Sequence, residues 1–135
     1  MRAQLLDVDC RVALTGVGQR RAADATRRLA RDARLLISTG CCGGLVPGAA
    51  AGMLAVPGRV LGPDGSEAPP PDAELRALAR ATVERLGLHC SERPLITVDR
   101  PVSTPEAKRS LHRRSGAVAV DMETAAIARE AAALG

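Results

Sequence analysis

The stretch GAVAVDMETAAIA, residues 116–128, changes its hydrophobic pattern halfway along. Its first residues are small and apolar, which favours a buried strand, and the alanine-rich run that continues to Leu134 favours a helix. Two acids, Asp121 and Glu123, stand where the expected strand enters the expected helix. A carboxylate is costly in apolar surroundings unless it is paired, so both acids need a partner or a role.

Two interpretations of these acids stay open on spacing alone. Asp121 can cap the helix while Glu123 favours its positive end, which is a purely structural role. A carboxylate at such a strand end can instead accept hydrogen bonds from both hydroxyls of a ribose. The residues around the two acids do not choose between these interpretations.

The rest of the chain alternates between the same two patterns. Short apolar runs predict strands over Cys10–Thr15, Leu35–Thr39, Met53–Val60 (with Pro57 weakening its far end), Leu95–Val98 and Gly116–Val120. Apolar residues at helical spacing predict helices over Arg20–Arg31, from Asp72 to Gly87, and from Thr104 with Pro105 in the first turn. Residues 61–71 read as a surface loop. We therefore expect a three-layer α/β/α fold with a mixed central sheet, in a single domain over residues 1–135.

The first glycine-rich turn follows the expected strand at residues 10–15. Gly16 and Gly18 would expose backbone N–H groups at the start of the next helix, which favours an anion site. The turn also matches a loose dinucleotide-binding fingerprint. That fingerprint needs an acid at the end of the second strand, where this chain has Ser-Thr-Gly at residues 38–40. Dinucleotide binding is therefore a minor alternative.

The second glycine-rich turn, STGCCGG at residues 38–44, follows the second expected strand. Open α/β sheets bind ligands at this edge, and three glycines within five residues allow a flat ligand to approach the backbone. A nucleophilic Cys41 would need an activating base, and nothing in the sequence places His89 or His112 beside it. We therefore disfavour a catalytic thiol.

Composition narrows the class of protein. The chain has 135 residues, 46% of them apolar, which is enough for the core of one domain. No run approaches the roughly 18 apolar residues of a membrane span, and no secretion signal is recognisable, so we expect a cytoplasmic protein. Phe, Tyr and Trp are absent and the arginines are scattered, which argues against nucleic acid as a partner despite a net charge of +4.

The cysteines do not suggest a metal site. No Cys-x-x-Cys pair occurs, so the spacing of a zinc site is missing and no metal is expected. A disulfide framework is not expected in a cytosolic protein. We expect reduced, mostly buried thiols at Cys10, Cys41, Cys42 and Cys90.

Three stretches together resemble the purine nucleoside phosphorylase and nucleosidase superfamily. They are GVG at residues 16–18, LISTGCCGGL at residues 36–45 and, above all, VDMETAAIA at residues 120–128. The resemblance runs from about Cys10 to the C-terminus. It is strongest to the methylthioadenosine/S-adenosylhomocysteine nucleosidases and to the hopanoid-associated phosphorylase-like members.

This resemblance implies cleavage of the N-glycosidic bond of a purine nucleoside, with adenine as the expected base, by water or by phosphate. Glu123 would be the catalytic residue, because it would hold the ribose hydroxyls and stabilise the positive charge of the sugar. Other residues would contact the sugar and base or lie near the attacking water or phosphate. The substrate-binding positions implied in this way are Gly16, Gly18, Cys41, Cys42, Gly43 and Met122.

The resemblance implies no metal and no organic cofactor, with inorganic phosphate as an optional co-substrate. It implies a small-molecule nucleoside as the partner and a homo-oligomer. Members of the family begin with a strand that brings an acid near the attacking water, and residues 1–9 contain no such apolar strand, which leaves Asp7 or Asp9 as a substitute. Members also continue into a strand whose Asp protonates the leaving base, whereas this chain stops at Gly135.

We therefore expect the fold to lack the first and last strands of the family, and the chain to lack the general acid. The enzymatic interpretation rests on the resemblance alone. The alternative is a non-catalytic nucleoside-binding or oligomer-forming remnant of the family.

Overall fold

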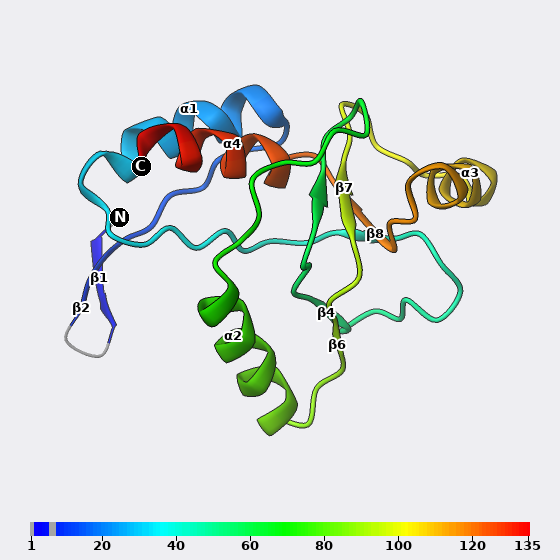
Figure 1. The fold of residues 1–135 in the computed structure, drawn as a ribbon, viewed down its shortest axis with the longest axis horizontal. Helices are drawn as coiled ribbons and strands as arrows, with labels where there is room; N and C mark the ends of the chain where they lie inside the picture. The colour runs from blue at the N-terminus through cyan, green and yellow to red at the C-terminus, as the bar shows by residue number, and fades with distance from the viewer. Residues whose placement is uncertain (1, 6–7) are drawn as a thin grey trace.

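The computed structural model describes residues 2–5 and 8–135, and its centre is a mixed sheet (Figure 1). In spatial order the strands are β5 (Val60–Leu61), β7 (Leu95–Thr97), β8 (Ala119–Asp121) and β3 (Gly43–Gly44). The first three run parallel, whereas β3 pairs antiparallel with β8. The mixed sheet is confirmed, and the predicted strands at residues 95–98 and 116–120 appear as β7 and β8.

Helices cover both faces of this sheet (Figure 1). Successive residues of a strand point to opposite faces, so β5, β7 and β8 each contribute to two apolar clusters. The cluster under α3 (Pro105–Ser115) contains Leu45, Leu61, Ile96, Leu111, Ala117 and Val120. The cluster under α4 (Thr124–Leu134) contains Val60, Ala68, Leu95, Ala119 and Ala125. The predicted arrangement of helix, sheet and helix is confirmed for this part of the chain.

The predicted helix starts have the local chemistry that the sequence indicates. The Asp72 carboxylate accepts from Leu75 N at 2.9 Å and begins α2 (Ala73–Arg85). The Thr104 hydroxyl accepts from Ala107 N at 3.2 Å and begins α3. Within the described residues, no helix combines the length and apolar character needed to cross a lipid bilayer.

The helix predicted at residues 20–31 is confirmed as α1 (Gln19–Leu29), followed by the short 3-10 helix η1 (Ala30–Asp32). It lies along α4, although the two helices are about a hundred residues apart in sequence (Figure 1). Ala22 and Ala25 are buried, and Arg27 forms an ion pair with Glu130 of α4. This packing fixes the N-terminal end of α1 near the start of α4.

The strand predicted over Cys10–Thr15 is wrong. The structure instead has a hairpin of β1 (Arg2–Leu5) and β2 (Val8–Arg11), and residues 12–16 lie outside any strand. The expectation that residues 1–9 contain no strand also changes, since β1 pairs antiparallel with β2. The apolar run reads as a strand in the sequence, but only its first residues find a partner strand among the described residues.

The strand predicted over Leu35–Thr39 is also wrong. These residues belong to no strand, and Ile37 is 76% exposed. An apolar run becomes a buried strand only when a ladder and a covering layer are present, and the described residues provide neither for this run. The predicted strand–helix–strand unit at residues 10–39 therefore keeps its helix and loses both strands.

Two further predictions are refined. The run at residues 53–60 divides at Pro57 into β4 (Leu54–Ala55), parallel to β6 (Cys90–Ser91), and the start of β5. The segment at residues 61–71 is a surface loop, as predicted, except that Leu61 ends β5 and Ala68 is buried. Helix α2 forms as predicted, but of its apolar positions only Val83 is buried.

Candidate functional site

Glu123 lies where β8 enters α4 and points its carboxylate toward the start of α1. Its Oε1 accepts a hydrogen bond from Gly18 N at 2.6 Å, and its Oε2 accepts one from Met122 N at 3.2 Å. Glu123 occupies the N-cap position of α4 without using its side chain as a cap. Glu123 as a residue is half-buried, and two backbone amides hold its carboxylate.

The partner of this carboxylate is a glycine for a conformational reason. Gly18 has φ +100°, a region that favours glycine, and it is the N-cap of α1. Its N–H therefore belongs to the positive end of that helix, which favours a nearby negative charge. Gly16 also has a positive φ of +74°, so the turn directs one backbone amide at Glu123. The sequence predicts an anion-favouring turn here, and the structure shows that its occupant is the carboxylate of Glu123.

Asp121 has a structural role in this arrangement. One of its oxygens accepts from the Thr97 hydroxyl at 2.7 Å, and the other accepts from Thr124 N at 2.9 Å and from the Thr124 hydroxyl. Both oxygens are therefore engaged at the start of α4. The sequence left the roles of the two acids open. In the structure the Asp121 side chain caps α4 by accepting from Thr124, whereas the Glu123 carboxylate is turned away from its own helix.

A shallow surface hollow of about 550 Å³, largely open to solvent, lies beside the Gly18 turn. Its lining comes from the start of α1 and from the loop after β7: Val17, Gly18, Gln19, Arg20, Arg21 and Asp99. Gln19 Nε2 donates to Asp99 Oδ1 at 2.5 Å and joins these two segments. Sequence reasoning missed Gln19 and Asp99. Asp99 could have been found because it follows β7, at the same sheet edge as Asp121.

In the glycine-rich turn at residues 38–44, only the last two residues join the sheet, as β3, and we call them the glycine wall. Gly43 pairs with Val120 and Gly44 with Ala119, three and four residues before Glu123. A Cβ on Gly44 would lie 2.5 Å from Ala49 Cβ, so this backbone approach requires glycine. A second hollow of about 290 Å³ lies against this wall and includes Cys42, Gly44, Met53 and Val118 in its lining.

The two cysteines at this wall differ from the buried thiols that the sequence predicts. Cys41 and Cys42 are both free and exposed. Partial burial raises the pKa of the Cys42 thiol, and the charge of Asp121 and the adjacent Cys41 raise it further. Cys42 therefore stays protonated at neutral pH. This argues against a thiolate nucleophile at Cys42.

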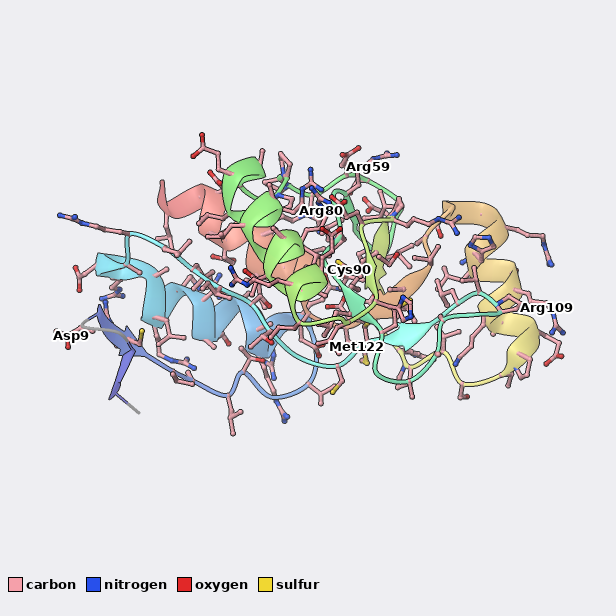
Figure 2. The ribbon with its side chains drawn as sticks, turned by 90° about the horizontal axis from the view of Figure 1, so that it is seen from below. Asp9, Arg59, Arg80, Cys90, Arg109 and Met122 are labelled. Carbon is pink, nitrogen blue, oxygen red and sulfur yellow. The ribbon has the colours of Figure 1, made fainter. Side chains whose placement is uncertain are left out.

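The structure brings most of the predicted residues to one sheet edge. Gly18 contacts Glu123, Met122 donates to it, and Gly43 pairs with the end of β8. Of the predicted residues, Gly18 lines the first hollow and Cys42 the second. Neither hollow is lined by Gly16, Cys41, Gly43, Met122 or Glu123. Of the substitute acids, Asp7 lies outside the described residues. Asp9 lies at one end of the molecule, far from Met122 (Figure 2).

The fold and site therefore define a mixed α/β protein with a carboxylate at a helix start, between a glycine turn and a glycine wall. A family model described as the phosphorylase superfamily matches residues 3–135, and the chain belongs to this superfamily. The resemblance drawn from residues 16–18, 36–45 and 120–128 is confirmed. The dinucleotide alternative loses its basis, because no strand leads directly into the Gly16–Gly18 turn. No curated protein matches the chain.

Solved structures of similar fold include those of nucleosidases. A mutant of the Helicobacter pylori nucleosidase MTAN with 5'-methylthioadenosine in its active site has a TM-score of 0.90 at 20% identity and matches 99% of this chain. A futalosine hydrolase mutant from the same organism has a TM-score of 0.87 at 21% identity and also matches 99%. The 5'-methylthioadenosine/S-adenosylhomocysteine nucleosidase of Neisseria meningitidis has a TM-score of 0.88 at 26% identity and matches 98%.

The relatives are longer than this chain. It spans 65% of the MTAN mutant, 69% of the futalosine hydrolase mutant and 66% of the Neisseria enzyme. At identities near 20%, the similarity establishes the fold rather than the reaction.

Proposed function

We propose that this chain binds a purine nucleoside, with adenine as its base, and takes part in cleaving its N-glycosidic bond. The observation that supports this most is the placement of the Glu123 carboxylate. Glu123 is half-buried, two backbone amides hold its carboxylate, and its partner Gly18 lines a hollow. Membership of the phosphorylase superfamily and the nucleosidase relatives support the reaction class.

Glu123 has the chemistry that a ribose diol requires. A carboxylate oxygen has two lone pairs, so the oxygens that accept from Gly18 and Met122 retain capacity for the two sugar hydroxyls. Cleavage of the glycosidic bond leaves positive charge on the sugar, and a fixed negative group nearby stabilises that charge as it develops. In this proposal Met122 packs against the sugar.

The other predicted residues contact the substrate or co-substrate and do not take part in the reaction themselves. Cys41, Cys42 and Gly43 form the wall beside base and ribose, and the turn at Gly16 and Gly18 lies toward the attacking water or phosphate. Arg20 and Arg21 line the hollow beside this turn, so an anionic co-substrate finds positive charge there.

A second candidate function is nucleoside binding without turnover. The acids near Glu123 are already engaged, because Asp121 uses both oxygens at α4 and Asp99 accepts from Gln19. General acid–base catalysis contributes about 10²- to 10⁴-fold in rate. Asp121 is not free to supply it, and Asp99 is held by Gln19 through one of its oxygens. The observation favours slow or absent turnover by this chain with retained binding.

Incubation with adenosine separates the two functions. Purified chain is mixed with adenosine with and without phosphate, and free adenine is measured by chromatography. Release without phosphate indicates hydrolysis, and release that requires phosphate indicates phosphorolysis. We expect E123Q to lower release by about 10²-fold or more, since a preorganised electrostatic group is lost.

The matched control is E106Q, which alters an exposed glutamate of α3 that pairs with Arg109. It should leave release unchanged. Saturable adenosine binding without adenine release would favour the second candidate. No saturable binding by the folded chain would contradict both.

A further inference from the structure

Thr97 has the largest fully buried side chain in the described part of the molecule, and it is polar. It lies on β7, opposite Asp121 of β8. Its hydroxyl donates to Asp121 Oδ1 at 2.7 Å and accepts from Ala125 N at 2.9 Å. A single hydroxyl thus connects two strands to the first turn of α4.

The two bonds help to give each amide in the first turn of α4 a hydrogen-bond acceptor. The first amides of a helix have no partner within the helix. In α4 the amide of Thr124 donates to Asp121, that of Ala125 donates to Thr97, and that of Ala126 donates to Glu123 O at 3.1 Å. No amide of this turn is left for the Glu123 carboxylate to cap.

We propose that Thr97 is a positioning residue for Glu123, because its hydroxyl accepts from Ala125 N, the amide of the first turn of α4 that the Glu123 carboxylate would otherwise bind. An oxygen-bearing side chain at the N-cap position can accept from an amide of the first turn, as Ser, Thr, Asp and Asn ordinarily do. Glu123 occupies this position, yet its oxygens face Gly18 and Met122. Removing the Thr97 hydroxyl leaves the amide of Ala125 unpaired in a buried place, and the nearby Glu123 carboxylate is drawn back toward its own helix.

The consequence reaches across the molecule to Gly18. The Gly18 amide is 105 residues away in sequence and contacts Glu123 Oε1 directly, so its protection from hydrogen exchange reports where the carboxylate points. The neighbouring amide of Ala22 donates to Gly18 O at 3.1 Å and reports whether α1 itself is intact. Comparing the two amides separates repositioning of Glu123 from general loosening.

The test uses T97V, which keeps the shape of the side chain and removes the hydroxyl, and T97S, which keeps the hydroxyl. Amide exchange is followed by NMR on the full chain. We expect T97V to speed exchange at Gly18 by about tenfold or more, as expected for loss of a charge-assisted bond, with Ala22 changed far less. T97S should restore the protection of Gly18.

Equal acceleration at Gly18 and Ala22 in T97V, or unchanged Gly18, would overturn the proposal. If T97V does not fold, D121N weakens the same network from its other end and is judged by the same two amides. That Thr97 matters for ligand binding, by positioning Glu123, rests on the proposed function. If wild-type chain fails to bind adenosine while Gly18 still depends on Thr97, the proposed function fails and the positioning role stands.

Discussion

Two regions of this molecule carry similar apolar patterns and reach different structures. In the C-terminal region, β7 and β8 lie between helices, and Ile96 is 3% exposed. In the N-terminal region, the run at residues 35–39 joins no strand, and Ile37 is 76% exposed. Composition and β-propensity are alike, so the difference comes from whether a neighbouring strand and a covering layer are present.

The largest expected effect contrasts one isoleucine from each region. Ile96→Ala removes side-chain volume between the sheet and α3 and should lower the free energy of unfolding by about 2–5 kcal/mol. Ile37→Ala removes an exposed side chain and should change it by less than about 0.5 kcal/mol. Urea unfolding followed by circular dichroism measures both. Similar losses in the two variants would show that the run at residues 35–39 is buried after all.

Substitutions at two glycines show where along the chain the packed C-terminal region begins. In Gly44→Ala the new methyl group meets Ala49 at the edge of the sheet, and this overpacking should cost about 1–3 kcal/mol. Gly40 has open space around it, so Gly40→Ala should cost less than about 0.5 kcal/mol. The same unfolding experiment applies. A costly Gly40→Ala would place the boundary earlier in the chain.

The helix starts give a smaller contrast. Helix α3 has its own side-chain cap at Thr104, whereas the N-cap of α1 is Gly18, whose amide depends on Glu123. Thr104→Ala should lower the free energy of unfolding by about 1 kcal/mol, and Thr104→Asn should retain most of it because Asn is an equally good cap. An unchanged unfolding midpoint in Thr104→Ala would show that the cap contributes nothing to α3.

The smallest effect concerns the pH dependence of Cys42. Its pKa is raised in the folded chain, so the reactive thiolate forms only at higher pH than in the unfolded chain. In a C41S variant that also lacks Cys10 and Cys90, the midpoint of iodoacetamide alkylation should be higher without urea than with it. Adding D121N should lower the folded midpoint, since a nearby negative charge is removed. Identical midpoints with and without urea would contradict the environment described for Cys42.

The sequence predicts most of the features that depend on neighbouring residues, such as where helices begin. The starts of α2 and α3 follow from Asp72 and Thr104, and the strand-to-helix passage at residues 116–134 follows from its change of pattern. It does not predict which apolar runs find a partner strand, because pairing depends on residues far away in the chain. The runs at residues 10–15 and 35–39 therefore read as strands.

In the candidate site, too, the residues were predictable from the sequence but their long-range contacts were not. Glu123, Met122 and the glycines were available from spacing and resemblance. The contact between Gly18 and Glu123, the capping role of Asp121 and the place of Asp99 are long-range facts, since each depends on how β7, β8 and α1 come together. Thr97 had no signal beyond its position at the end of a strand.

In the proposed function, the Glu123 carboxylate holds the diol of a ribose. Isothermal titration calorimetry of the full chain with adenosine and with 2',3'-dideoxyadenosine, which lacks both hydroxyls, tests it most directly. We predict that wild-type chain binds adenosine about tenfold more tightly or better, as expected for hydrogen bonds to a charged group, and that E123Q loses this preference while E106Q keeps it. Equal affinity of wild-type chain for the two nucleosides would contradict the claim.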